Sequence, residues 1–489
     1  MKEKLKHIAV IACLLPLLFF NIKDTHDWGD DFAQYLIEAK NILEHKPLGE
    51  SGFIANPNFV LGPNCYPPGF PLIMALTNPL THLKMSGLNV LISFFLLLIG
   101  YFSFLLLCKW FHFLPAIVFS LIIVYNPMAL QLKNGVLSDY PFTAILLLFF
   151  LIYLFEDKKR SHFILLGFIL AFAVNTRVVG WILVIAVITE TSFKLLIKYY
   201  RQKLFDKIYF MNKLYLLISF LVFHLLFYIV FPQNIIYYDN PVQLPFFDRL
   251  VINANYNYGA LKHFFSCYDE GFLNVLVSYG IVFTALIGML IFIFKPDSLK
   301  PTILLFFFLG YVLSILIHQY SDTGIRLVIP IITIVLFFAS YALMLFLSHI
   351  PYKEYIAFCL GLIVLLCYKQ NSSIILKSKY EIPGPYSTEA ALTFDHINKN
   401  ASDKDVILFS KPRALTYFTG KKTTINTEKK TQNFIKEELD KIDPTFVLIN
   451  KEITDDSTKT YFSTPLEQWK EVYSSENFKL YKNLLHSHN

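Results

Sequence analysis

The stretch "HIAVIACLLPLLFFNIKDTHDWGDDFAQYLIEAKNILEHK", residues 7–46, decides the fold class. It opens with an apolar run and continues into an amphipathic helix headed by two adjacent aspartates, Asp30 and Asp31. The run follows the basic start MKEKLKH, and no small-x-small cleavage site comes after it, so it predicts a retained anchor rather than a cleaved signal peptide. The stretch therefore predicts a chain inserted in a membrane, with a helix lying on the surface after the first span.

The composition of the whole chain agrees with this prediction. Of 489 residues, 55% are hydrophobic and only 16% are charged, and the mean hydropathy is +0.50. Apolar runs recur up to about residue 369, each long enough to cross a hydrocarbon core of roughly 30 Å, and they predict an α-helical polytopic protein with about 11 spans. The spans are expected at 7–22, 86–108, 111–130, 138–155, 161–176, 178–197, 212–231, 271–294, 300–318, 325–348 and 352–369.

The charges of the connecting loops predict the orientation. Basic residues gather in EDKKRSH (156–162) and in 194–213, whereas the long loop 232–270 has only Arg249 and Lys262 as Lys or Arg. The positive-inside rule then places the N-terminus in the cytoplasm and the tail outside, in a multi-pass protein of the cytoplasmic (inner) membrane. This pattern accounts for the net charge of +7, so no nucleic-acid partner is expected.

Four regions follow along the chain: an anchor (1–22), a first extracytoplasmic loop (23–85), a helix bundle (86–369) and a soluble tail (370–489). The tail alternates helix and strand patterns, which predicts a small α/β domain that covers or shapes a site. Helices are expected at 388–400 and 431–442, and strands at 405–410, 444–451 and 477–483. Cys65 and Cys267 both fall on the expected outer side, where an oxidising compartment can join them, although sequence alone does not show their separation.

The acidic pair of the first loop is the first candidate for chemistry. Asp30 and Asp31 precede apolar residues at helical spacing, so they lie where the helix dipole favours a carboxylate. The alternative interpretation is an N-cap and a first-turn acid with no chemical role. The proline-rich turn YPPGFPL (66–72) returns the chain to the bilayer and has a re-entry interpretation of its own.

Further candidates lie near the outer ends of predicted spans. Asp139 and Tyr140 stand in SDYPF, where a simple helix start is the alternative. Arg177 and Arg326 are costly in apolar segments and suit phosphate, with snorkelling to the interface as the alternative. His318 can donate or accept a proton, although an interfacial histidine without chemistry is the commoner case.

Taken in order, these motifs resemble the GT-C glycosyltransferases that use polyprenyl-phosphate sugars, especially the bacterial relatives of protein O-mannosyltransferases and aminoarabinose transferases (glycosyltransferase family 39-like). The matching pieces are the acidic pair, YPPGFPL, SDYPF, TRVVGW (176–181), GIRLVIP (324–330) and FKLYKN (478–483). They span nearly the whole chain.

The resemblance implies an inverting transferase whose first-loop aspartate is the general base, with Asp30 favoured and Asp31 retained. It implies a polyprenyl-phosphate sugar donor and a lipid, glycan or protein acceptor. No cofactor is required, although a divalent cation is possible, with Asp30 and Asp139 as its ligands. The implied roles of the others are donor phosphate binding for Arg177 and Arg326, and substrate orientation for Tyr66, Asp139, Tyr140 and His318.

Two other classes of function share some of these features. A transporter or flippase of lipid-linked glycans also needs many spans and intramembrane arginines, but the chain shows no paired halves with broken helices. A polymerase or ligase of lipid-linked glycans has its main outer loop late in the chain, and the loop 232–270 is compatible with that. Catalysis by a polymerase or ligase would survive removal of Asp30 and Asp31.

Overall fold

The structure is a computed structural model that falls into two compact units. It describes residues 3–54, 56, 64–154, 159–203, 205–232, 245–266, 272–294, 301–317, 325–377, 384–425, 431–464 and 466–486. The helical unit consists of Met1–Ile22, Leu88–Val230 and Leu244–Lys379. The α/β unit consists of Lys23–Gly87, Phe231–Gln243 and Tyr380–Asn489, so it joins the first loop to the tail.

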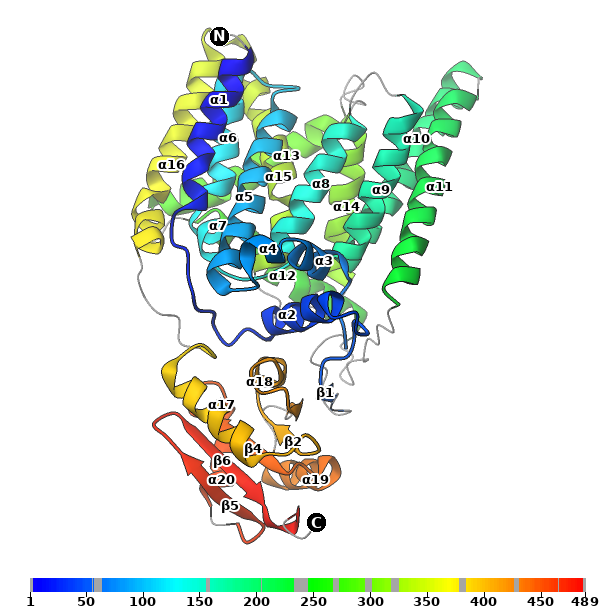
Figure 1. Cartoon of the computed structure of the whole chain (residues 1–489). Helices are drawn as coiled ribbons and strands as arrows, with labels where there is room; N and C mark the ends of the chain where they lie inside the picture. Colours follow the sequence, from blue (N-terminus) through cyan, green and yellow to red (C-terminus); the bar gives the residue numbers. More distant parts are fainter. Residues whose placement is uncertain are drawn as a thin grey trace. The chain divides into compact units, whose positions relative to one another are not determined.

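The helical unit is built almost wholly of long apolar helices (Figure 1). They are α1 (Glu3–Leu14), α5 (Met85–Leu107), α6 (Phe113–Val124), α7 (Pro127–Leu132), α8 (Asp139–Tyr153), α9 (Arg160–Thr176), α10 (Trp181–Gln202), α11 (Lys207–Val230), α12 (Phe246–Phe264), α13 (Phe272–Phe294), α14 (Thr302–Ile317), α15 (Ile329–Phe346) and α16 (Lys353–Lys377). Short 3-10 turns follow the same course at η1 (Leu15–Leu18), η2 (Val178–Gly180), η4 (Ile325–Val328) and η5 (Leu347–His349).

Each of the eleven predicted spans carries a helix, and the predicted class of α-helical polytopic membrane protein is confirmed. Within the described residues, six helices have the length and hydropathy of a membrane span, and four apolar helices are shorter. The long ones are Met85–Leu107, Val178–Gln202, Lys207–Val230, Val275–Phe294, Ile325–His349 and Lys353–Lys377. The number of crossings and the sidedness of the loops stay predictions.

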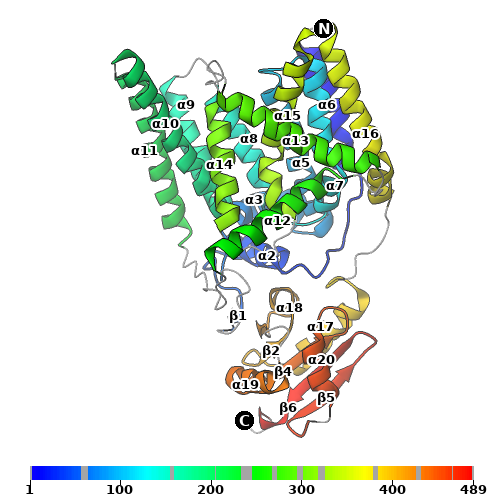
Figure 2. The same ribbon diagram turned by 180° about the vertical axis from the view of Figure 1, so that it is seen from behind.

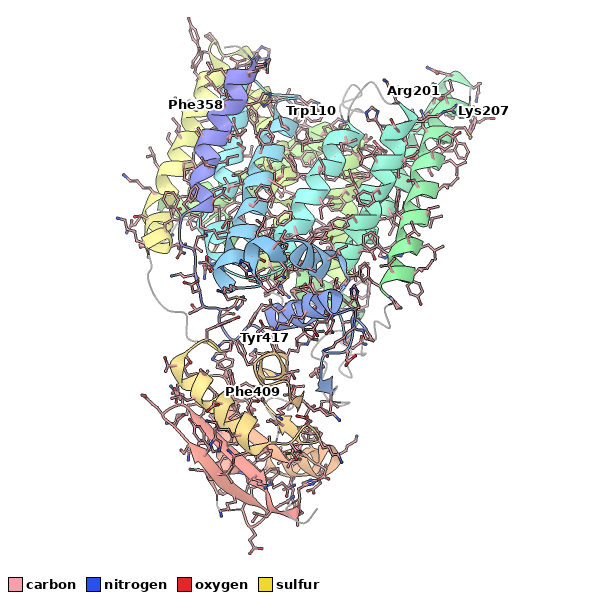
Figure 3. The ribbon with its side chains drawn as sticks, in the orientation of Figure 1. Trp110, Arg201, Lys207, Phe358, Phe409 and Tyr417 are labelled. Carbon is pink, nitrogen blue, oxygen red and sulfur yellow. The ribbon has the colours of Figure 1, made fainter. Side chains whose placement is uncertain are left out.

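Helix α15 forms the core of the helical unit, because every residue from Ile329 to Ser340 is buried. By contrast, α11 and α16 expose most of their apolar side chains and lie at opposite sides of the unit (Figures 1 and 2). This distribution suits helices in lipid, where outward apolar side chains carry no cost. Arg201 and Lys207 lie close to the connection between α10 and α11 (Figure 3).

Helix α12 corrects the prediction that 232–270 is only a loop. Its residues Phe246–Phe264 form five turns that pack against α13 and α14 (Figure 2). Polar side chains hold this contact, since the amide of Asn253 donates to the carbonyl of Leu316 at 3.0 Å and both Asn253 and Asn257 are buried. The mixed polar and apolar pattern of the segment concealed a helix that is buried on one side.

The α/β unit contains a six-stranded sheet with helices around it (Figure 1). Its helices are α2 (Asp30–Leu43), α3 (Gly69–Leu76), α4 (Asn78–Thr81), α17 (Thr388–Asn400), α18 (Pro412–Thr419), α19 (Gln432–Ile442), α20 (Asp456–Ser463) and the 3-10 turn η6 (Leu484–His486). Its strands are β1 (Phe53–Ile54), β2 (Val406–Leu408), β3 (Lys422–Thr424), β4 (Phe446–Asn450), β5 (Trp469–Ser474) and β6 (Phe478–Asn483). The strand order is β1-β3-β2-β4-β6-β5, with β1 to β4 parallel and β5 and β6 antiparallel.

The predicted tail elements are confirmed as α17, β2, α19, β4 and β6. Four elements went unpredicted: α18, β3, α20 and β5. Strand β1 was not predicted either, and it comes from the first loop, where Phe53 pairs with Thr423 of the tail. The small α/β domain is therefore completed by a segment from the other end of the sequence.

Trp28 joins the first loop to the tail. Its indole is only 8% exposed and meets the rings of Phe394, Phe409 and Phe478 edge-on, with centroids 5.7 to 6.4 Å apart. The chain also approaches closely at Gly384, where an added Cβ would lie 2.0 Å from the carbonyl oxygen of His26. A large aromatic buried among aromatics is a strong packing contribution, so the first loop belongs to the core of this unit.

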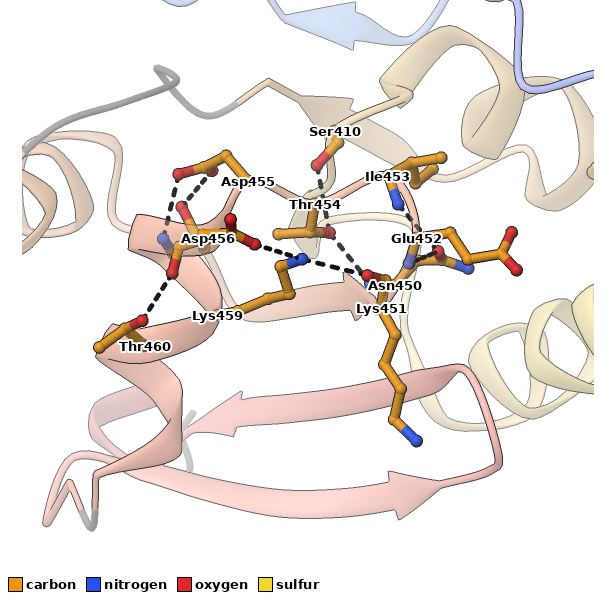
Figure 4. Close-up of polar contacts among 11 residues, drawn as sticks. Ser410, Asn450, Lys451, Glu452, Ile453, Thr454, Asp455, Asp456, Lys459 and Thr460 are labelled. Carbon is orange, nitrogen blue, oxygen red and sulfur yellow. Dashed lines mark hydrogen bonds and ion pairs between the residues drawn. The ribbon is translucent and has the colours of Figure 1, made fainter.

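A polar turn after β4 fixes the segment that leads into α18 (Figure 4). The side chain of Asn450 accepts the backbone N–H groups of Glu452 and Ile453, and the hydroxyl of Thr454 donates to or accepts from Ser410 at 3.2 Å. Ser410 follows β2 and comes directly before the start of α18. The turn therefore holds the N-terminal end of α18 in place.

Candidate active site

The head of α2 meets the head of α18 at Asp30. Gly29 is the extended residue before α2, and the carboxylate of Asp30 accepts the backbone N–H of Ala414 at 3.0 Å and of Arg413 at 3.4 Å. These are orphan donors in the first turn of α18, so Asp30 caps a helix from the tail. Burial raises the pKa of Asp30 to about 6, against the opposing charge of Arg413 and the N–H of Ala414.

Asp31 lies beside Asp30 but faces a different set of groups. The hydroxyl of Tyr66 donates to its Oδ1 at 2.6 Å, and the guanidinium of Arg413 lies 3.8 Å from the same oxygen. Arg413 also donates to the Tyr66 hydroxyl at 3.1 Å. The side chain of Asp31 is 24% exposed, whereas that of Arg413 is 1% exposed. The carboxylate of Asp31 is thus held from behind and reaches the surface.

A buried polar face runs along α2 behind this group. Asp30, Gln34 and Glu38 recur every four residues, which places them on one face of the helix, and Gln34 and Glu38 are fully buried. The carboxyl of Glu38 accepts from the amide of Gln34 at 2.7 Å and from the backbone N–H of Tyr66 at 2.8 Å. Glu38 therefore anchors the backbone of the residue whose hydroxyl binds Asp31.

Glu38 is mainly uncharged at neutral pH. Burial raises its pKa to about 8, although the donors from Tyr66 and Gln34 act in the opposite direction. Within the described residues, its second oxygen, Oε2, is buried without a hydrogen-bond partner. A protonated carboxyl carries no charge to desolvate, which explains how this side chain tolerates complete burial. The expected exposed polar face of α2 is therefore in part a buried one.

In the helical unit, the structure brings Asp139 and Arg177 together. Asp139 is the first residue of α8 and Arg177 ends α9, and their side chains form an ion pair that is mostly buried. A single buried charge is expensive, so each side chain lowers the cost of the other. This pair unites two residues that the sequence assigned to different tasks, phosphate binding and substrate orientation.

The other predicted residues are placed as follows. The hydroxyl of Tyr140 donates to the carbonyl of Ala129 at 2.7 Å and is buried, so it ties α8 to α7. Arg326 lies in η4 and is partly buried. His318 falls outside the described residues. Cys65 is a buried free thiol, and its suggested partner Cys267 also falls outside the described residues.

The predicted residues therefore form two groups that belong to different units. Asp30, Asp31 and Tyr66 gather in the α/β unit, and Asp139 and Arg177 pair in the helical unit. In the described part of the chain, no group of three or more His, Cys, Asp or Glu side chains is arranged to hold a metal ion. The suggested cation site of Asp30 and Asp139 draws on both units and stays a prediction.

Arg413 and Glu38 are the members of the site that sequence reasoning missed. Arg413 stands in KPRALTYFTG, a short segment of the tail without a recognisable motif. Its only signal is an arginine just after a proline that starts a helix. Glu38 offered a clearer signal, because it shares a helical face with Asp30 rather than the charged face opposite.

Comparison with known proteins supports the fold strongly and the sequence only weakly. No protein-family model matches the chain, and no curated protein sequence matches it either. Among solved structures, ArnT from Cupriavidus metallidurans bound to undecaprenyl phosphate aligns over 98% of both chains, with 13% identity and a TM-score of 0.57. The archaeal oligosaccharyltransferase AglB from Archaeoglobus fulgidus, in complex with an inhibitory peptide and a dolichol-phosphate, aligns over 92% of this chain and 70% of its own, with 11% identity and a TM-score of 0.59.

Both neighbours have the GT-C fold of membrane glycosyltransferases. The fold of this chain is therefore the GT-C fold, and the resemblance suggested by the motifs is confirmed at the level of fold. Fold alone does not assign chemistry, which must be argued from the site.

Proposed function

We propose that this protein is an inverting glycosyltransferase that moves a sugar from a polyprenyl-phosphate donor to an acceptor hydroxyl at the outer face of the cytoplasmic membrane. The GT-C fold supports the class of enzyme. The observation that carries the proposal is the partly exposed carboxylate of Asp31, which is fixed by Tyr66 and Arg413 at the head of α2.

Asp31 is the general base of this proposal. A base must reach the proton that it abstracts, and Asp31 is the more exposed of the two acids. Both oxygens of Asp30 already accept backbone N–H groups of α18, so Asp30 acts as a positioning residue. The sequence favoured Asp30 but retained both, and the hydrogen bonds support Asp31.

The reaction needs one proton transfer and one substitution at carbon. As the acceptor oxygen attacks C1 of the sugar, its proton passes to the carboxylate of Asp31. The bond between C1 and the phosphate oxygen breaks, and its electron pair stays on that oxygen. The products are a glycoside of inverted configuration and a polyprenyl phosphate monoester, and no nucleotide takes part.

The leaving phosphate requires positive charge, for which Arg177 and Arg326 are our candidates. Arg177 is paired with Asp139 in the absence of substrate, so the donor phosphate would compete with Asp139 for the guanidinium. The fork of donors on arginine can serve two anions at once, so the pair can also be retained while phosphate binds.

The test is transfer by the purified full chain from a panel of labelled polyprenyl-phosphate monosaccharides, with envelope lipids and glycans as acceptors. Consumption of one donor by the wild type, and its loss in Asp31→Asn, would support the proposal. Movement of a lipid-linked glycan across vesicle membranes without donor consumption would replace it with a transporter. Turnover that is unchanged in Asp30→Asn and Asp31→Asn proteins would exclude a first-loop base.

A further inference from the structure

A second cavity lies within the α/β unit, beyond the residues of the proposed reaction. Its volume is about 470 Å³, and its walls come from the first loop and from the tail. Lys40, His82 and Lys84 contribute cationic or protonatable groups, and Asp24 is the one acidic residue in the lining. Tyr386 and Tyr417 contribute aromatic surface to the same wall. The cavity is therefore basic and aromatic together.

Lys40 is fixed at this cavity by an aromatic ring. Its ammonium lies 4.2 Å from the centroid of the Tyr417 ring, which is a favourable cation–π distance. Figure 3 shows Tyr417 on the tail side of this unit. Partial burial lowers the pKa of Lys40, because the charged form is poorly solvated there. An anion next to this ammonium would replace the solvation that it lacks.

The opposite wall is a strained turn between α4 and α5. His82 and Leu83 are consecutive non-glycine residues in the left-handed region, with φ of 51° and 50°. Each such residue costs of the order of 1 kcal/mol, and strain of this kind is concentrated at functional sites. Gly87 permits the turn to close, because an added Cβ would lie 2.6 Å from the carbonyl oxygen of Thr81. The strained turn presents His82 and Lys84 to the cavity.

The cavity and the proposed base share helix α2. Asp31 and Lys40 are nine residues apart on it, which corresponds to about 14 Å at about 1.5 Å per residue. An extended acceptor can therefore place a hydroxyl near Asp31 while a second group reaches Lys40. Binding energy from such a remote group can be used to orient the reacting end.

From these observations we infer that this cavity binds the phosphate or carboxylate of an acidic glycan acceptor, with Lys40 and Lys84 as the anion-binding residues and Tyr417 as the aromatic wall. The inference deepens the proposed function and rests on it. A lipid headgroup offers the same anionic chemistry, because α5 begins a candidate span at Met85. The test must therefore separate a glycan from a lipid as the source of the anion.

Binding is measured by saturation-transfer NMR on the full chain in phosphatidylcholine nanodiscs, with glucose 6-phosphate, glucuronate and neutral glucose as probes. We expect the wild type to bind the two acidic sugars at least tenfold more tightly than glucose. The variant Lys40→Gln/Lys84→Gln should lose this preference, while Lys46→Gln/Lys422→Gln, with the same change in net charge at exposed sites outside the cavity, should keep it.

Three results would overturn the inference. One is an equal preference for acidic sugars in the wild type and in Lys40→Gln/Lys84→Gln. Another is the absence of any preference in the wild type. The third is loss of glucose 6-phosphate binding when phosphatidylglycerol replaces phosphatidylcholine, which would reassign the cavity to a lipid headgroup. The assay needs neither donor nor transfer, so its failure is distinguishable from failure of the proposed reaction.

Discussion

The phenol of Tyr66 donates a 2.6 Å hydrogen bond to the carboxylate of Asp31, across 35 positions of the sequence. Burial raises the pKa of Tyr66 well above its usual value, so the phenol remains a donor at every physiological pH. The same hydroxyl accepts from Arg413 of the tail at 3.1 Å. One oxygen atom therefore connects the acidic loop, the proline turn and the tail.

The two acids of the first loop should respond differently to the same substitution. Loss of a general base costs about 10²- to 10⁴-fold in rate, so we expect Asp31→Asn to lower kcat by that amount. Asp30→Asn should retain most of the rate, because an amide oxygen can still cap α18. Single-turnover transfer by both variants decides the assignment. A larger loss in Asp30→Asn than in Asp31→Asn would return the role of base to Asp30.

Tyr66→Phe removes a hydroxyl without changing the shape of the ring. It takes away one donor from Asp31 and one acceptor from the buried Arg413, and an unsatisfied buried group costs about 1 to 3 kcal/mol. We expect lower kcat with little change in the donor KM. Tyr140→Phe is the matched control, since its hydroxyl binds only the carbonyl of Ala129 among the contacts described, and it should lower stability and leave kcat unchanged. Equal kcat losses in both variants would contradict a special role for Tyr66.

Glu38 should make stability fall as pH rises. The folded pKa of Glu38, about 8, lies above its usual 4.5, so between these values the folded state holds a proton that the unfolded state has released. Stability is then highest below pH 4.5 and falls towards pH 8 by up to about 1.4 kcal/mol per pH unit. Asp30 adds a slope of the same sign between 3.8 and about 6.

Unfolding midpoints at pH 5 to 9 test this dependence. Glu38→Gln should flatten the fall between pH 5 and 8, because the amide does not titrate. The exposed Glu44 provides the control, and Glu44→Gln should keep the wild-type slope. A wild-type slope in Glu38→Gln would show that Glu38 is ionised in the folded protein.

The ion pair of Asp139 and Arg177 predicts opposite effects on donor binding. If Arg177 binds the donor phosphate, Arg177→Gln should raise the donor KM several-fold. Asp139→Asn removes the competing carboxylate and should lower it. Steady-state kinetics with varied donor concentration measures both. A rise in KM in both variants would instead indicate that the pair is needed intact.

Trp28→Ala should loosen the tail. Deleting a buried aromatic side chain costs about 3 to 5 kcal/mol, and here the cavity would open in the core shared by the first loop and the tail. We expect faster proteolysis of residues 384–486 and loss of transfer. Trp181→Ala, in the helical unit and 41% exposed, should leave proteolysis of the tail unchanged. The same proteolysis rate in Trp28→Ala would show that the core does not depend on Trp28.

Local patterns in the sequence predicted the helices well, since α2, α17 and α19 begin within one residue of the expected positions. They failed where partners are distant. The pairing of Phe53 with Thr423, and of Asp31 with Arg413, joins segments almost a chain length apart, and no periodicity encodes such pairs. Helix α18 was missed because eight residues after a proline give too short a pattern to recognise.

The place of Trp28 in the core of the tail also sets an order of events during synthesis. Trp28 leaves the ribosome early, but the rings that enclose it, from Phe394 to Phe478, are made only after all the predicted spans. The α/β unit therefore cannot close around the acidic loop until translation is almost finished. A nascent or truncated chain would hold Asp31 without Arg413, so the arrangement couples assembly of the proposed site to completion of the polypeptide.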